Sequence, residues 1–293
     1  MTKSVLFLCA AALLSCGTAL DVLAQADTPQ DQPMSITIPM PQGSVPEGIA
    51  IKDGIAFVSS VSQGSVYRID LDSAEPEGLN EGGGRGGAVE VLDAKSGKVL
   101  ASYKVADAEE TFINDVDRLG DAIYATDSFA PVVYKLPLGE GGDLPEEEDI
   151  ERIPLSGVTY EEGFNANGIT QTPDESALLI VKMNTGDLLR VDPTSGAAEV
   201  VDTGDVDLTG GDGLLREGNI LYVVRNTVNR VAVLELDDAA TSASLKDELT
   251  DPGFDTPTTV ARFESRLYLP NARFTVDEPA NAEFSVIGIE YEP

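Results

Sequence analysis

One stretch near the beginning of the chain sets out a design that the rest of it repeats: Pro46-Glu47-Gly48-Ile49-Ala50-Ile51-Lys52-Asp53-Gly54-Ile55-Ala56-Phe57-Val58. A short polar start leads into a β-rich run, Asp53-Gly54 supplies a tight turn, and a second β-rich run follows. The same order returns in segments that begin at Ile113-Asn114, Ala166-Asn167, Gly211-Asp212 and Pro257-Thr258. The chain therefore repeats one small β unit.

The spacing inside the units is constant. Ten residues separate the polar position from the aromatic one in four units: Glu47 to Phe57, Asn114 to Tyr124, Asp212 to Tyr222 and Thr258 to Tyr268. The later units begin 53, 45 and 46 residues apart, counted from Asn114 to Asn167 to Asp212 to Thr258. About four strands in roughly 45 residues is typical of a β-propeller blade. We therefore expect an all-β fold, a β-propeller of the six-bladed type.

The first interval departs from the repeat. The 67 residues from Glu47 to Asn114 are too many for one blade and few for two. The outer half of a blade is visible in Ala88–Asp93 and Lys98–Tyr103, but Glu77–Gly87 replaces its inner half. The sequence thus predicts a shortened second blade. We also expect Ser35–Ile38 to pair with Phe284–Ile289, because this closes the ring and removes exposed strand edges. A short helix is expected within Ala239–Leu249.

The N-terminal residues resemble an export signal. Lys3 precedes an apolar run, Val5 to Leu14, that is too short to span a bilayer. Residues 1–24 are therefore predicted to be a signal peptide or a lipoprotein signal. Residues 25–34 are expected to form a flexible linker, and residues 35–293 the propeller domain.

Two processing routes remain open. Val22-Leu23-Ala24 suits cleavage that releases a soluble protein beginning at Gln25, whereas Leu13-Leu14-Ser15-Cys16 resembles a lipobox, in which Cys16 is lipidated. Either route predicts an exported protein, periplasmic or secreted in the first case and membrane-anchored by lipid in the second. The mature protein is expected to have no transmembrane span.

Composition excludes several kinds of chemistry. The chain has no histidine, which excludes Ser-His-Asp and Cys-His catalysis and His-ligated zinc. Both cysteines, Cys9 and Cys16, lie in the predicted signal, so no disulfide is expected in the mature domain. The net charge is −32, from 51 acidic and 19 basic residues. Nucleic acid is therefore not expected as a partner, and the oligomeric state is left open.

The repeat brings oxygen-bearing side chains to equivalent positions. In a propeller the first strand of each blade lines the central channel, so residues that begin these strands form a ring at one mouth. The ring positions carry Glu47, Asn114, Asn167, Asp212 and Thr258. Two carboxylates and two amide oxygens suit a hard cation such as Ca²⁺, with another divalent cation as the alternative. Any single Asn-Gly or Asp-Gly would more often be a turn.

These segments resemble the SMP-30/gluconolactonase-like family of calcium-dependent six-bladed β-propeller hydrolases. The resemblance rests on Pro46-Glu47-Gly48, Ile113-Asn114-Asp115, Asn167-Gly168 and Asp212-Gly213. It implies that Glu47, Asn167 and Asp212 ligate the metal, with Asn114 as a fourth ligand or a substrate contact. It also implies that Asp212 doubles as the catalytic base. Phe112-Ile113 departs from the family at a position where an arginine contact is expected.

The predicted function is therefore metal-dependent hydrolysis of a small sugar-lactone-like or acyl ester, with the cation in the central channel. The alternative is a non-enzymatic periplasmic propeller that binds a ligand or partner and keeps the metal for structure, because fold alone does not decide between them. A pocket above the metal favours the enzyme, and a mouth blocked by Gly82–Gly87 favours the scaffold.

Overall fold

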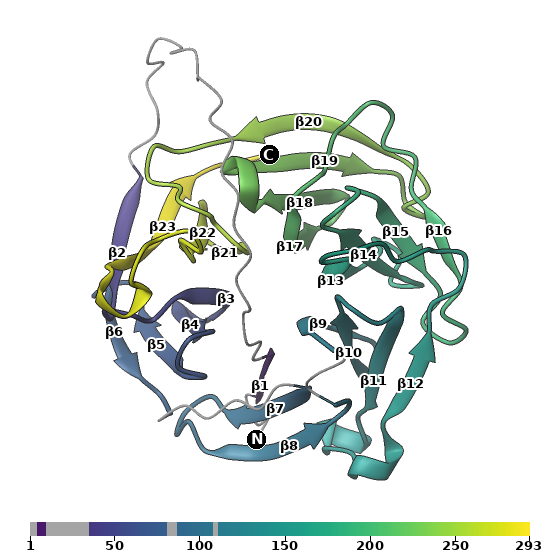
Figure 1. The fold of residues 1–293 in the computed structure, drawn as a ribbon, viewed down its shortest axis with the longest axis horizontal. Helices are drawn as coiled ribbons and strands as arrows, with labels where there is room; N and C mark the ends of the chain where they lie inside the picture. The colour runs from purple at the N-terminus through teal and green to yellow at the C-terminus, as the bar shows by residue number, and fades with distance from the viewer. Residues whose placement is uncertain (1–4, 10–34, 81–86, 108–110) are drawn as a thin grey trace.

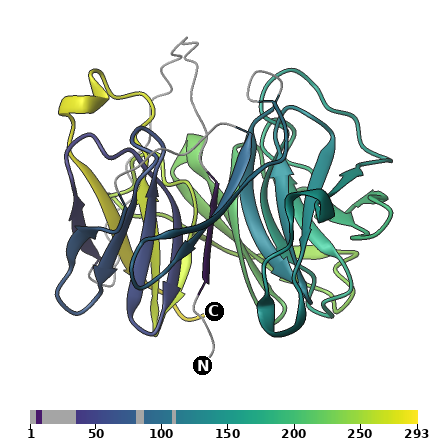
Figure 2. The same cartoon turned by 90° about the horizontal axis from the view of Figure 1, so that it is seen from below.

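The computed structural model describes residues 5–9, 35–80, 87–107 and 111–293, and these form a β-propeller. Six sheets stand around a central channel, and β3, β9, β13, β17 and β21 lie nearest its axis (Figure 1). In the perpendicular view the loop that carries η4 projects from one end of the ring, and the C-terminus lies at the other (Figure 2). The expected all-β propeller is confirmed.

Five sheets of the described chain have four strands each. The first contains β3 (Pro46–Lys52), β4 (Ile55–Ser60), β5 (Val66–Asp70) and β6 (Glu75–Gly78). The next complete one contains β9 (Ile113–Leu119), β10 (Ala122–Asp127), β11 (Val132–Pro137) and β12 (Glu151–Pro154). It is followed by β13 (Ala166–Gln171), β14 (Leu178–Lys182), β15 (Leu188–Val191) and β16 (Ala198–Val200). Then come β17 (Gly211–Glu217), β18 (Ile220–Arg225), β19 (Arg230–Leu236) and β20 (Ala243–Leu249). The last contains β21 (Ala261–Phe263), β22 (Arg266–Asn271), β23 (Phe284–Glu290) and β2 (Ile36–Met40).

The second position in the ring differs from the others. β7 (Ala88–Asp93) and β8 (Val99–Lys104) form the predicted outer hairpin, and β1 (Val5–Cys9) pairs with β7 on its channel side. The structure therefore has five complete blades instead of six, with a three-stranded sheet at the shortened position. The strand that fills this position comes from the predicted signal segment. Most of the loop expected to replace the inner half, residues 81–86, lies outside the described residues.

The ring closes as predicted. β2 pairs antiparallel with β23, with Ile38 opposite Val286, so the last blade takes its outermost strand from the beginning of the domain. This pairing joins two segments that are distant in sequence and covers the edge of β23.

The core lies between neighbouring sheets. One cluster, between the β9–β12 and β13–β16 sheets, includes Tyr124, Val133, Ile169 and Ile180, and similar clusters fill the other seams. The second strand of a blade has neighbours on both faces, and every residue of β10 and β14 is buried. This explains why these segments read as continuous apolar runs. The seam between the β3–β6 sheet and the three-stranded sheet is smaller, and its buried residues are Phe57, Val66 and Leu92.

Helical structure in the described residues is confined to four short 3-10 turns: η1 (Glu140–Gly142), η2 (Glu147–Asp149), η3 (Asn226–Val228) and η4 (Pro279–Asn281). The helix expected within Ala239–Leu249 is wrong, because Ala243–Leu249 forms the outer strand β20. Pairing with β19 gives this exposed segment its backbone hydrogen bonds, and that tertiary contact overrides local preference. No helix in these parts of the chain is long and apolar enough to cross a membrane.

Candidate functional site

A β-bulge places each predicted ligand. In β3 the register shifts between Pro46 and Ile49, so two residues stand opposite one on β4. The same shift lies between Ala166 and Ile169 in β13, and between Gly211 and Leu214 in β17. The bulged pairs are Glu47-Gly48, Asn167-Gly168 and Asp212-Gly213, and in β9 the equivalent pair is Asn114-Asp115. A bulge turns a side chain out of the strand's normal alternation, and here it does so in four sheets alike.

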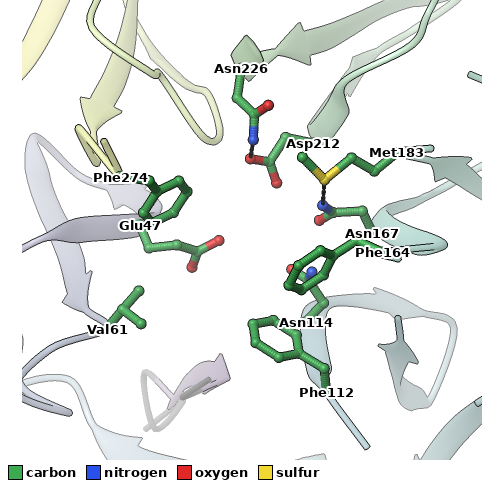
Figure 3. A pocket seen from close by; sticks show the side chains of 10 residues that line it. All are labelled: Glu47, Val61, Phe112, Asn114, Phe164, Asn167, Met183, Asp212, Asn226 and Phe274. Atoms are coloured by element: carbon green, nitrogen blue, oxygen red, sulfur yellow. Dashed lines mark hydrogen bonds between the residues drawn. The ribbon is translucent and has the colours of Figure 1, made fainter. Parts of the chain in front are cut away.

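The four predicted ligands meet in the channel. Glu47, Asn114, Asn167 and Asp212 line one pocket together, and their polar ends face its centre (Figure 3). The same four also line a smaller cavity deeper in the channel, so they form the floor of the outer pocket. Thr258 occupies the equivalent position of the last blade but does not join them. Its buried hydroxyl donates to the Glu47 carbonyl oxygen at 2.6 Å.

A second set of residues holds the ring in place. It lies fourteen residues after the ring position in two blades: Ser128 follows Asn114, and Asn226 follows Asp212. In the blade with the longer turn the separation is sixteen, from Asn167 to Met183. We call Ser128, Met183 and Asn226 the supporting residues. Sequence reasoning missed them, although the fourteen-residue separation shared by two blades was present as a signal.

The hydroxyl of Ser128 fixes the orientation of Asn114. Ser128 donates its proton to the Ala166 carbonyl oxygen at 2.7 Å, so its oxygen is left to accept. The Asn114 amide nitrogen donates to that oxygen at 3.0 Å. The Asn114 amide oxygen is therefore the end that remains for a ligand in the pocket.

Asn167 carries a buried oxygen without a protein partner. Its amide nitrogen contacts the Met183 sulfur at 3.6 Å, and its Oδ1 atom accepts no hydrogen bond within the described structure. Asn167 is only 3% exposed. A buried amide oxygen that accepts nothing costs free energy, so its presence indicates a group that binds there.

The carboxylates of the channel lack a compensating positive charge. No lysine or arginine is among the described residues that line the pocket. Burial raises the pKa of Glu47 well above its usual value, and the charges of Asp212 and Asp115 raise it further. Burial also raises the pKa of Asp212 to about 8, against the effect of a hydrogen bond from Asn226 at 2.5 Å. Such a site is stabilised by a bound cation.

Asp115 adds a third carboxylate that sequence reasoning did not include in the site. It accepts hydrogen bonds from the backbone amides of Val116 at 2.8 Å and Ile169 at 3.2 Å. Burial nevertheless raises the pKa of Asp115 to about 7. Asp115 lines the deeper cavity and not the outer pocket. It therefore increases the negative potential beneath the ring.

The ring fits a hard divalent cation through mixed ligands. In the described part of the chain, no three Asp, Glu, His or Cys side chains are grouped closely enough to hold a metal by themselves. The predicted set does not require this, since two of its four ligands are amides. The unpaired Asn167 oxygen, the fixed Asn114 amide and the uncompensated carboxylates of Glu47 and Asp212 are all hard oxygen donors.

The sequence matches no family model and no curated protein. Among solved structures, the fold is similar to the calcium-binding protein regucalcin from Agrobacterium tumefaciens. The identity is 16%, the match covers 85% of this chain and 91% of that one, and the TM-score is 0.61. A luciferin-regenerating enzyme matches at 12% identity over 88% and 96% of the two chains, with a TM-score of 0.60. The Malassezia sympodialis allergen Mala s 1 matches at 12% identity over 87% and 96%, with a TM-score of 0.61. At such identities the likeness shows the propeller fold.

Proposed function

We propose that this protein is a hydrolase of small esters or lactones that depends on a divalent cation, with Ca²⁺ as the expected ion. The observation that supports it best is the meeting of Glu47, Asn114, Asn167 and Asp212 on the floor of one open pocket. Their side chains would hold the cation. The fold likeness to a calcium-binding propeller is consistent with this assignment.

The pocket favours catalysis over a purely structural metal. A structural ion is expected in a closed site, whereas the floor of this pocket is reached from solvent. Glu47 is partly exposed to the pocket, while Asp212 is 5% exposed. A substrate can therefore approach the ring from the pocket.

A bound divalent cation supplies polarisation of the carbonyl oxygen and stabilises the negative charge that develops on it. Asp212 would accept a proton from the attacking water. Its Oδ2 atom accepts a hydrogen bond from the Asn226 amide, which orients the carboxylate. Water adds to the carbonyl carbon, the ester C–O bond breaks, and the proton taken up by Asp212 passes to the alcohol oxygen.

The test separates holding the ion from accepting a proton. We expect Asp212→Asn to lose about 10²–10⁴-fold in kcat, a loss that saturating Ca²⁺ does not repair. Asn167→Ala is the matched control, because an amide oxygen binds metal but takes no proton at neutral pH. Its defect should be repaired by excess Ca²⁺. Equal repair of both variants would refute the proton-accepting role. A wild-type protein inactive on all lactones and esters would favour a non-enzymatic binding protein.

We further propose that the protein is exported and meets its substrate outside the cytoplasm. Support comes from the apolar run that follows Lys3 and from the two processing motifs. Intact-mass measurement of the exported protein distinguishes a chain that begins at Gln25 from one lipidated at Cys16. A product that keeps residues 1–15 would refute export.

A further inference from the structure

The walls of the pocket differ in chemistry from its floor. The ring residues and Asn226 supply the polar groups, whereas Val61, Phe112, Phe164, Met183 and Phe274 supply the rest of the lining (Figure 3). The pocket has about 610 Å³ of empty space, including the part open to solvent. Every polar side chain among its described lining residues thus lies at or beside the ring.

Two phenylalanines form one side of this apolar wall, and a third packs against them. The rings of Phe112 and Phe164 meet edge to face, with centroids 4.9 Å apart and planes at 88°. Phe129 packs against both, with ring centroids 5.6 Å from Phe112 and 5.2 Å from Phe164. Across the pocket, Phe274 is 37% exposed. Exposed aromatic rings that converge on a pocket are apolar surface that a ligand can cover.

The backbone holds the aromatic rings in fixed positions. Asp127 is fully buried, and its Oδ1 atom accepts hydrogen bonds from the amides of Phe112, Phe129 and Ala130 at 3.0–3.1 Å. Asn165 is 1% exposed. Its side-chain amide forms hydrogen bonds with the backbone of Glu161 and Gly163, in the segment that precedes Phe164. The side of the wall that carries Phe112 and Phe164 is therefore organised before any ligand binds, which lowers the entropy cost of binding.

We infer that the ligand of this pocket carries an apolar group the size of a phenyl ring or a short alkyl chain, and that it is not a polyhydroxylated sugar lactone. The inference rests on the proposed function for the reacting ester group. The apolar wall would recognise the ligand whether the protein is a hydrolase or a non-enzymatic binding protein. Sugar hydroxyls placed against these phenyl rings would lose their water without gaining a partner. An alkyl or aryl group would gain from burial against the same surface.

The test compares two δ-lactones and one stable analogue with Ca²⁺-loaded protein. δ-Decalactone carries a pentyl chain on its lactone ring. D-glucono-δ-lactone carries a hydroxymethyl group at the same position and hydroxyl groups on the other ring carbons. The lactam analogue of δ-decalactone resists hydrolysis, so calorimetry can measure its Kd without turnover. We expect Phe164→Ala and Phe274→Ala each to weaken lactam binding by about 10- to 100-fold while leaving the affinity for Ca²⁺ unchanged. Val200→Ala, at an exposed site on the outer strand β16, is the matched control.

The outcomes separate this inference from the proposed function. Hydrolysis of δ-decalactone with the expected loss in both variants supports both. Lactam binding that both variants weaken, without hydrolysis of any ester, supports the inference and refutes the hydrolase. Preferred hydrolysis of D-glucono-δ-lactone refutes the inference and supports the hydrolase. Absence of lactam binding in the wild type refutes the inference. Phe274 is the variant to trust if Phe164→Ala does not fold, because its exposed side chain contributes less to the core.

Discussion

Calcium should stabilise the folded ring, and the size of the effect can be worked out. A ligand that binds only the native state adds about 2.7 kcal/mol when its concentration is 100 times Kd. The predicted propeller domain spans residues 35–293. At about 2.1 cal/mol/K of unfolding entropy per residue, that stabilisation corresponds to a rise in Tm of about 5 °C. Differential scanning calorimetry in excess Ca²⁺ and in EDTA measures it directly.

Loss of one carboxylate ligand should remove most of this gain. Mutation of an outer partner of a metal ligand costs about 10- to 100-fold in affinity, so loss of a ligand itself should cost at least about 100-fold. At the same Ca²⁺ concentration the stabilisation then falls to about 0.4 kcal/mol, less than 1 °C in Tm. We expect this for Glu47→Gln and Asp212→Asn. Glu235→Gln, at an exposed site on β19, should keep the full shift.

Two results would refute the reasoning. Identical melting curves in Ca²⁺ and EDTA, for protein shown by elemental analysis to be metal-free in EDTA, would exclude a cation at the ring. A full rise in Tm with Ca²⁺ in both Glu47→Gln and Asp212→Asn would place the bound ion elsewhere in the molecule.

The two variants also remove buried negative charge, so each should be more stable than the wild type in EDTA.

Three further predictions follow from the same contacts. Burial raises the pKa of Asp115 to about 7 and of Asp212 to about 8, so protonation of these carboxylates stabilises the fold. In EDTA this stabilisation should be complete below about pH 4 and lost as the pH rises through 7 to 8. Thermal melts from pH 5 to 9 should therefore show a Tm that falls with pH, and Ca²⁺ should make this fall smaller. A chain that begins at Gln25 lacks β1, so the β7 amides should exchange with deuterium faster than in the full-length chain, and equal exchange would show that β1 does not protect them. Ser128→Ala removes the acceptor that orients the Asn114 amide, and calorimetry should show Ca²⁺ affinity about 10- to 100-fold weaker; unchanged affinity would contradict the supporting role.

The fold was largely predictable because each blade repeats the same local pattern of polar, turn and apolar residues. A ten-residue offset from Glu47 to Phe57 returns in three other blades, since each hairpin needs the same strand lengths and the same turn. Closure between β2 and β23 was predictable from the same physics, because an open edge is costly. The channel-side strand of the second sheet was not, since nothing local in Val5–Cys9 indicates pairing with β7.

The pocket wall was not predictable for a different reason. Phe112 and Phe164 precede their strands in segments that differ in length and sequence from blade to blade, and Phe274 lies in the long connection between β22 and β23. The repeat carries no information about where such segments fold over the channel. The ring could be predicted because it lies at the start of the inner strands, and the wall could not because it lies outside them.

Asp115 shows how a departure from a repeat can matter more than the repeat. Three blades place glycine after the ring residue, and in two of them the space beside it is filled. A Cβ atom on Gly168 would lie 2.2 Å from the Asp212 carbonyl oxygen, and one on Gly213 would lie 2.1 Å from the Thr259 hydroxyl. The last blade has Thr259 at this position, and the β9 blade has the acidic residue Asp115. There the carboxylate bonds the Ile169 amide of the next blade and faces the cavity beneath the ring. Asp115 therefore adds a third carboxylate under the proposed cation site, where we expect it to strengthen cation binding without being a ligand.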